Sequence, residues 1–179
     1  GGLMDSVWRE GGFRPLAEQD LLSLEDGVRE ALRGKRLFLT GGTGFVGIWL
    51  LQTLYAQHLR EDLECDVHVL SRNPLSFLKA YPHFASWKGL HLVQGDVRRW
   101  EAPDLKVDMV LHGATSASKV LNDGSPLEMA DVIVRGTERV LDFARKTGAR
   151  RFLFLSSGLA YGRQPLDCPA IAEHQMGHL

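Results

Sequence analysis

The chain has 179 residues, of which 44% are hydrophobic and 24% charged, and its formal net charge at pH 7 is -1. This length fits one globular domain, and the near-zero charge argues against nucleic acid or an anionic membrane surface as a partner. Apolar runs such as "RFLFL" are much shorter than the roughly 20 residues of a membrane-spanning helix.

Residues 1–34 are predicted to form an arm and a short helix. Residues 1–19 contain several glycines and show no regular apolar period, so we expect an arm that lies on the domain or stays mobile. In "DLLSLEDGVREALRGK" the pair Ser23 and Asp26 has the spacing of a capping box, which predicts a helix start. Gly34 is the predicted end of this helix.

Residues 35–165 alternate between apolar strands and amphipathic helices. The predicted strands are "RLFLT", "DVHVLS", "LHLVQGD", "KVDMVLHGA" and "RRFLFLSS". The predicted helices are "FVGIWLLQTLYAQHL" and "LEMADVIVRGTERVLDFARKTG", the second with Gly148 as its C-cap. Almost continuous apolar strands separated by helices are typical of a parallel sheet covered on both faces. The sequence therefore predicts an α/β, doubly wound, Rossmann-like domain over residues 35–165, followed by a tail over residues 166–179.

The first strand is followed by a glycine loop. Gly41, Gly44 and Gly47 form the pattern G-x-x-G-x-x-G. The first glycine permits a sharp turn, the second lets the backbone approach a pyrophosphate, and the third lets helix and strand pack closely. No Lys-Ser/Thr pair follows the last glycine, which argues against a P-loop NTPase. The loop predicts a dinucleotide site, with a purely structural tight turn as the alternative.

The stretch "TGGTGFVG" resembles the T-G-x-x-G-F-x-G loop of the extended short-chain dehydrogenase/reductase family, the NAD(P)-dependent sugar epimerases and dehydratases. Four later stretches resemble segments of this family in the same order: "LVQGDVRR", "LHGATSAS", "VRGTERVLDFARKTGARRFLFLSS" and "SSGLAYG". The resemblance covers about residues 35–165. It implies the cofactor-binding part of an epimerase/dehydratase-type oxidoreductase for a nucleotide sugar, with the C-terminal part of the family fold missing.

The candidate cofactor contacts follow from the loop, the end of the second strand and this resemblance. They are Gly41, Thr43, Gly44, Phe45, Val46, Gly47, Ser71, Arg72, Asp96, Val97, His112, Ala114, Thr115 and Ser156. By resemblance, Asp96 would contact the adenine amine and Val97 its ring, while Ala114 and Thr115 would line the nicotinamide side. We interpret His112 as a structural hydrogen-bonding residue. Arg98 and the arginine after it are interpreted as part of a solvated face.

The end of the second strand bears on the choice between NAD and NADP. NAD binders carry a carboxylate there for the ribose hydroxyls, whereas this sequence reads "VLSRNP", with Ser71 and Arg72. A guanidinium pairs well with a 2′-phosphate, so the sequence favours NADP over NAD. The alternatives are that Arg72 is a solvated turn residue or stacks on adenine.

The catalytic candidate is Ser157, which by resemblance occupies the Ser/Thr position that hydrogen-bonds the reacting oxygen; the alternative is a strand-end cap. The family also uses a Tyr as acid or base, with its pKa lowered by a Lys four residues later. None of Tyr55, Tyr81 and Tyr161 has a Lys at that spacing, and Ile133 stands where the family usually has Asn. Whether this chain alone is an enzyme is therefore left open.

The cysteines, the C-terminal histidines and the sheet edge bear on compartment, metal binding and partners. The two cysteines lack metal-site spacing and no secretory leader is recognised, which predicts a cytoplasmic protein. His174 and His178 have helical pair spacing without a third ligand, so no metal site is predicted. Three hypotheses stay open: a catalytically incomplete cofactor-binding part, a truncated fragment, and a non-catalytic dinucleotide-binding protein that pairs, as a homodimer or with another chain, through an exposed sheet edge.

Overall fold

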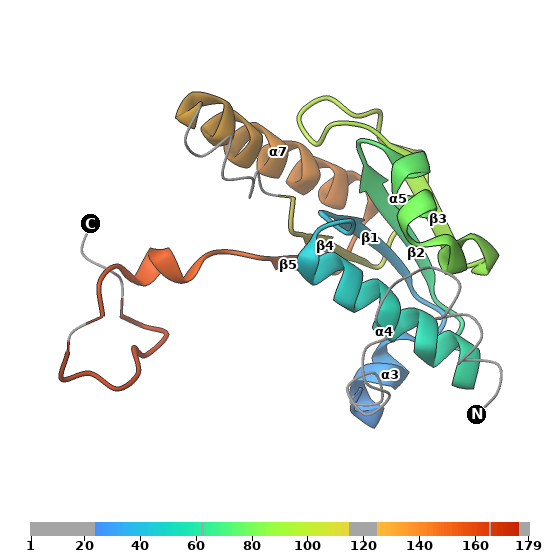
Figure 1. Ribbon diagram of the computed structural model, residues 1–179, viewed down its shortest axis with the longest axis horizontal. Coiled ribbons are helices and arrows are strands. Elements are labelled where there is room, and N and C mark those ends of the chain that lie inside the picture. Colours follow the sequence, from blue (N-terminus) through green and yellow to red (C-terminus); the bar gives the residue numbers. More distant parts are fainter. Residues whose placement is uncertain (1–23, 62, 115–124, 165, 176–179) are drawn as a thin grey trace.

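The computed structural model describes residues 24–61, 63–114, 125–164 and 166–175. Its centre is a sheet of five parallel strands in the order β3-β2-β1-β4-β5 (Figure 1). The strands are β1 (Arg36–Thr40), β2 (Asp66–Ser71), β3 (Leu90–Gln94), β4 (Met109–His112) and β5 (Arg151–Phe154). This order confirms the predicted doubly wound sheet. The chain changes direction across the sheet at β1 and β4, so the crevice outside their carboxyl ends is the expected ligand position.

Helices cover both faces of the sheet. They are α3 (Asp26–Leu32), α4 (Phe45–Glu61), α5 (Pro74–Ala80) and α7 (Pro126–Thr147), with two 3-10 turns, η1 (Pro82–Ser86) and η2 (Gly158–Tyr161). Helix α7 begins where the Ser125 side chain accepts a hydrogen bond from the Glu128 N–H. It ends at Gly148, whose φ of 75° is the left-handed conformation expected of a glycine C-cap.

Two local predictions differ from the structure. The N-cap position of α3 is Glu25, which makes no side-chain capping hydrogen bond; the proposed capping residue Ser23 lies outside the described residues. Helix α5 and turn η1 were not predicted. The N-cap of α5 is Asn73, whose side chain accepts a hydrogen bond from the Ser76 N–H at 3.0 Å, and Pro74 follows it at the first helical position. The dipeptide Asn-Pro is a sequence signal for such a start.

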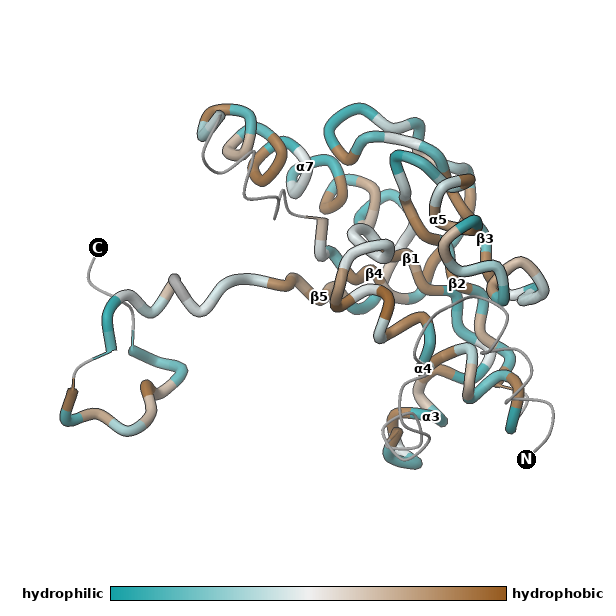
Figure 2. The backbone as a smooth tube through the Cα atoms, viewed as in Figure 1, coloured by the Kyte–Doolittle hydropathy of each residue, from teal (hydrophilic) through white to brown (hydrophobic). Residues whose placement is uncertain are grey.

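The apolar core lies in two layers, one on each side of the sheet. Because side chains alternate along a strand, Leu37 and Leu39 of β1 face one layer and Phe38 the other. The first layer includes α4 and the aromatic residues of α5 and η1. In the second, Phe38 stacks on Trp100 with ring centroids 5.0 Å apart and packs on Phe143 of α7. Figure 2 shows hydrophobic segments in the strands and in α4.

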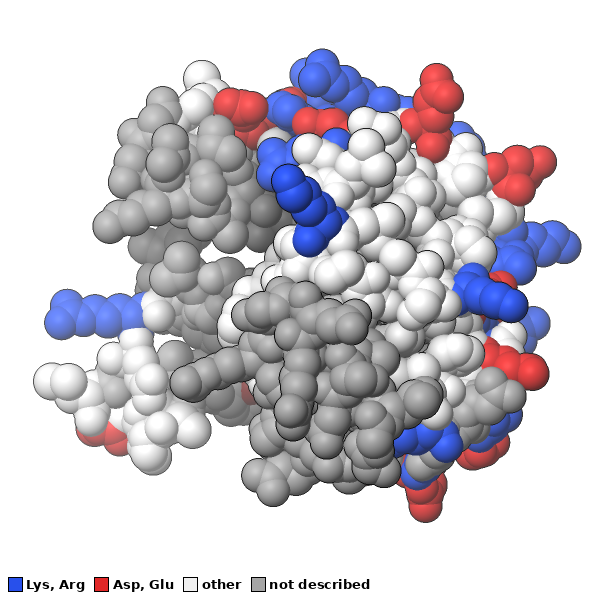
Figure 3. Space-filling model, turned by 45° about the vertical axis from the view of Figure 1, so that its right-hand side comes forward, with Lys and Arg blue, Asp and Glu red and all other residues white. Residues whose placement is uncertain are grey.

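Charged side chains of both signs are mixed on the surface. Figure 3 shows acidic and basic side chains interspersed around one face of the molecule, with uncharged residues over its centre, so neither sign of charge dominates this face.

After β5 the chain leads away from the sheet (Figure 1). Within the described ranges, no helix has the length and hydrophobicity needed to cross a membrane.

Candidate functional site

The glycine loop joins β1 to α4 at the carboxyl edge of the sheet. Gly41 has a φ of 72°, and a Cβ added to it would lie 2.3 Å from the Gly113 carbonyl oxygen. A Cβ on Gly47 would lie 2.4 Å from the Gly41 carbonyl oxygen. Both positions therefore require glycine for steric reasons. Gly41 also brings the loop into contact with the chain after β4, so two segments far apart in the sequence meet here.

The middle glycine leaves its backbone open. Gly44 is exposed, and a Cβ added to it would meet only the Gly41 carbonyl oxygen, at 3.3 Å. The first bond of α4 runs from the Ile48 N–H to the Gly44 carbonyl oxygen, at 2.9 Å. The N–H groups of the first turn therefore have no acceptor within the helix. Because that turn contains no acidic residue, its positive end is suited to a phosphate group.

The other residues of the glycine loop differ in how exposed they are. Phe45 is 80% exposed and Val46 is 48% exposed, whereas Thr43 is half-buried. Gly42, which the sequence reasoning passed over, is buried, and a Cβ on it would lie 2.6 Å from Val69 Cγ1 of β2. The two consecutive glycines in the sequence were the signal for this second close contact, which joins the loop to β2.

A buried hydrogen-bond chain lies directly beneath the loop. Thr40 Oγ1, at the end of β1, lies 2.5 Å from His112 Nδ1 and accepts a hydrogen bond from the Ala114 N–H at 3.2 Å. On the other side of the ring, His112 Nε2 lies 3.0 Å from Thr137 Oγ1 of α7. His112 is 1% exposed, and burial lowers the pKa of its imidazole, which keeps the ring neutral.

A neutral imidazole has one donor nitrogen and one acceptor nitrogen. One of the two threonine hydroxyls therefore donates to the His112 ring, and the other accepts from it. Thr40 Oγ1 also accepts the Ala114 N–H. The interpretation of His112 as a structural hydrogen-bonding residue fits this geometry. The chain connects the ends of β1 and β4 to α7, and Thr115, the next candidate contact, lies outside the described residues.

The segment after β3 carries the candidate adenine contacts. Both oxygens of Asp96 accept hydrogen bonds from the Arg98 side chain, at 2.9 and 2.7 Å. These bonds lower the pKa of the Asp96 carboxyl to about 2. Arg98 also forms ion pairs with Glu128 and Asp131 of α7, at 3.7 and 3.3 Å. The interpretation of Arg98 as part of a solvated face was therefore wrong: it orients Asp96 and ties this segment to α7.

Val97 is buried at 8% exposure and packs in the layer beneath α7. A Cβ added to Gly136 of α7 would lie 2.9 Å from Val97 Cγ1, so this glycine lets the helix approach. The Val97 side chain is thus part of the core.

The end of β2 has no carboxylate. Ser71 is 5% exposed, and its Oγ accepts a hydrogen bond from the Asn73 N–H at 3.3 Å. Arg72 is exposed, and no ion pair to its guanidinium occurs within the described ranges. Of these two candidate contacts, Arg72 is the one whose side chain is accessible to a ligand.

Ser156 and Ser157 follow β5 and are exposed. With Tyr161, Glu173 and Gln175 they line a cavity of about 320 Å³ in the C-terminal segment. The segment that follows β5 leads away from the sheet (Figure 1). Within the described ranges no group of three or more His, Cys, Asp or Glu side chains could hold a metal ion, and His178 lies outside them.

Comparison with known proteins extends this picture. Residues 37–177 match the model of the NAD dependent epimerase/dehydratase family. UDP-glucuronic acid decarboxylase 2 of Arabidopsis thaliana is 32% identical over 140 residues, which are 78% of this chain and 29% of that protein. UDP-glucose 4-epimerase of Streptomyces lividans is 33% identical over 141 residues, which are 78% of this chain and 40% of that protein. The chain thus spans less than half of the length of these relatives.

Solved structures agree with the sequence matches. A UDP-galactose 4-epimerase superposes with a TM-score of 0.60 at 27% identity, covering 80% of this chain and 44% of that one. The dTDP-glucose 4,6-dehydratase DesIV of Streptomyces venezuelae, solved with NAD and TYD bound, gives a TM-score of 0.60 at 26% identity, covering 73% of this chain and 42% of that one. The glycine loop and the sheet order agree with the match over residues 37–177. The chain therefore belongs to the NAD dependent epimerase/dehydratase family.

Proposed function

We propose that this chain binds a dinucleotide across the carboxyl ends of β1 and β4, as the cofactor-binding part of an oxidoreductase that acts on a nucleotide sugar. The observation that carries the proposal is the open backbone at Gly44 beside the unpaired N–H groups of α4. A pyrophosphate there would accept those N–H groups without displacing a side chain. The relatives named above act on UDP-linked or dTDP-linked sugars, which supports a nucleotide sugar as the substrate class.

Three of the candidate residues receive a specific role in this proposal. Asp96, oriented by Arg98, would accept from the adenine amine, and Ala114 would border the nicotinamide. The cofactor would take up or return a hydride, while Ser157 would donate a hydrogen bond to the reacting oxygen of the sugar. The sequence contains no Tyr-x-x-x-Lys, so we propose that the 179-residue chain does not turn over a nucleotide sugar by itself.

We propose NADP as the preferred cofactor. Arg72 is exposed at the end of β2, where a 2′-phosphate would lie, and no carboxylate stands beside it to bind ribose hydroxyls. NAD bound in DesIV supports the dinucleotide class without deciding between the two cofactors for this chain.

Calorimetric titration of the chain with NADP and then NAD tests both proposals. We expect NADP to bind more tightly, and Arg72→Gln to remove the difference by weakening NADP alone. Lys79→Gln is the matched control, because Lys79 is also an exposed cation but lies near the end of α5. Equal affinities in the unchanged chain would refute the NADP preference, and binding of neither cofactor would refute the dinucleotide proposal.

A second candidate function rests on the free edge of the sheet. Within the described ranges β5 pairs only with β4, and its residues Leu153 and Phe154 are 55% and 43% exposed. An apolar edge strand can pair with another chain. We therefore also propose a non-catalytic interaction protein that forms a homodimer through β5. Light scattering over a dilution series tests this, with Leu153→Lys as the variant expected to abolish any dimer; a monomer at every concentration would refute it.

A further inference from the structure

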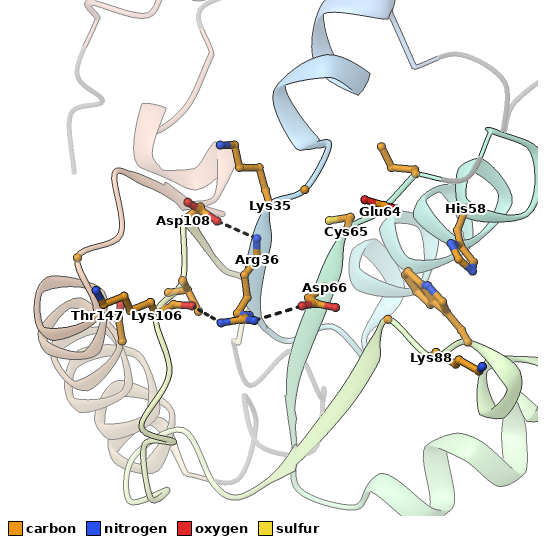
Figure 4. A pocket seen from close by; sticks show the side chains of 16 residues that line it. Lys35, Arg36, His58, Glu64, Cys65, Asp66, Lys88, Lys106, Asp108 and Thr147 are labelled. Carbon is orange, nitrogen blue, oxygen red and sulfur yellow. Dashed lines mark hydrogen bonds and ion pairs between the residues drawn. The ribbon is translucent and has the colours of Figure 1, made fainter.

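A second concave surface lies at the edge of the sheet opposite to the glycine loop. It is a groove of about 640 Å³ across the amino ends of β1, β2 and β4 (Figure 4). It extends from His58 of α4 to Thr147 at the end of α7, and we call it the amino-edge groove. Small-molecule sites have volumes of roughly 300 to 1,000 Å³, so the groove is large enough for such a ligand. The length of the parallel strands separates it from the candidate dinucleotide site.

Basic side chains surround the groove. Lys35, Lys88 and Lys106 stand around it (Figure 4). In the part of the chain that the structure describes, no ion pair or side-chain hydrogen bond involves their ammonium groups. They are therefore available to a ligand, and they are long and flexible enough to follow one.

Most acidic side chains of the groove are already engaged. Asp66 pairs with the Arg36 guanidinium at 3.4 Å, and Asp108 accepts a hydrogen bond from the Arg36 backbone N–H at 2.9 Å (Figure 4). The remaining carboxylate of the lining is Glu64. The lining thus has four basic side chains, the three lysines and Arg36, against three carboxylates, a local excess of one positive charge, although the net charge of the whole chain is -1.

The wall of the groove also holds buried donors without acceptors. Trp87 is 3% exposed, and its Nε1 has no hydrogen-bond partner among the described residues. The neighbouring Gly89 lies against the indole edge, because a Cβ there would lie 2.9 Å from Nε1. Arg36 Nε is likewise buried without a partner. Leaving such N–H groups unpaired costs stability, and an acceptor on a ligand would remove that cost.

We propose that the amino-edge groove is a second ligand site and that it binds a small phosphate-bearing molecule. A phosphate has several acceptor oxygens for the indole N–H, and its charge matches the three ammonium groups. A neutral or cationic ligand would leave those ammonium groups without a counter-charge. The site is independent of the dinucleotide proposal, because the two share no residue.

Nitrogen-15 NMR of the indole N–H groups gives a direct test with inorganic phosphate as the probe. The chain has four tryptophans, and Trp87→Phe identifies the Trp87 signal by its loss. We expect that signal to move saturably with phosphate and not with sodium chloride at matched ionic strength. The signal of Trp100 is the internal control, because its Nε1 is also buried without a partner but lies in the layer beneath α7.

Charge variants provide the second arm of the test. The triple variant Lys35→Gln, Lys88→Gln and Lys106→Gln should weaken phosphate binding about tenfold or more, because three charge contacts with the anion are lost together. The matched control replaces three exposed cations elsewhere: Lys79→Gln, Arg99→Gln and Arg163→Gln. An unmoved Trp87 signal, equal binding by both triple variants, or phosphate shifts confined to the amides of the glycine loop would each overturn the proposal.

Discussion

Thr40→Val is the sharpest test of the buried chain beneath the glycine loop. Valine keeps the shape of threonine but removes the hydroxyl that accepts the Ala114 N–H and lies 2.5 Å from His112 Nδ1. Thr40 and His112 are each 1% exposed, so water cannot replace the lost partner. Each buried polar group left unpaired costs about 1–3 kcal/mol. For the two groups together, we expect the free energy of unfolding to fall by about 2–6 kcal/mol.

Urea denaturation followed by circular dichroism measures this loss. With a slope of about 2 kcal/mol per molar urea, a loss of 3 kcal/mol moves the midpoint by about 1.5 M. The matched control Thr40→Ser keeps the hydroxyl and loses only a buried methyl group, which costs about 1 kcal/mol. If Thr40→Val were no more destabilising than Thr40→Ser, the hydroxyl would not hold His112 and Ala114 together and the reasoning would be refuted.

Three more predictions concern the loop, the adenine side and pH. Gly47→Ala should destabilise the chain by about 1–3 kcal/mol in urea, because its Cβ would lie 2.4 Å from backbone. Gly44→Ala should destabilise the chain less, because its Cβ would meet only the Gly41 carbonyl oxygen, at 3.3 Å, while it weakens dinucleotide binding. Arg98→Gln should weaken dinucleotide binding in calorimetry about tenfold by releasing Asp96, and an unchanged affinity would contradict that role. Burial lowers the pKa of His83 from 6.5 to about 4, so the unfolded chain binds a proton that the folded chain does not between those values. Stability should therefore fall as pH decreases from 7 to 4, by up to about 3 kcal/mol, and His83→Leu should reduce that slope in unfolding measurements at several pH values.

The order and type of the main elements could be predicted because their signals are local. Uninterrupted apolar runs predicted the strands, and two of them, residues 36–40 and 66–71, have the predicted bounds. The glycine pattern predicted the turn from β1 to α4, and Gly148 predicted the end of α7. Helix α5 was missed because it is only 7 residues long, and its start depends on one capping side chain.

The groups that meet across the sheet could not be predicted in this way. Thr40 and Thr137 lie in stretches that carry the family resemblance, but neither had a predicted role, and they become partners of His112 only because β1, β4 and α7 converge. Arg98 looked solvated in the sequence, yet Asp131 lies 33 positions later and reaches it when α7 packs over Val97. The amino-edge groove is formed by segments that the sequence separates widely.

The sequence by itself determined the parallel α/β architecture and the position of the glycine loop, because both depend on hydrophobic period and on the backbone freedom of glycine. Only the tertiary structure decided which polar groups are buried together and which charges remain unpaired. Those properties depend on distances between residues far apart in the chain, and burial then sets the strength of their interactions. The neutral state of His112, the orientation of Asp96 and the free ammonium groups of the amino-edge groove all belong to this second class.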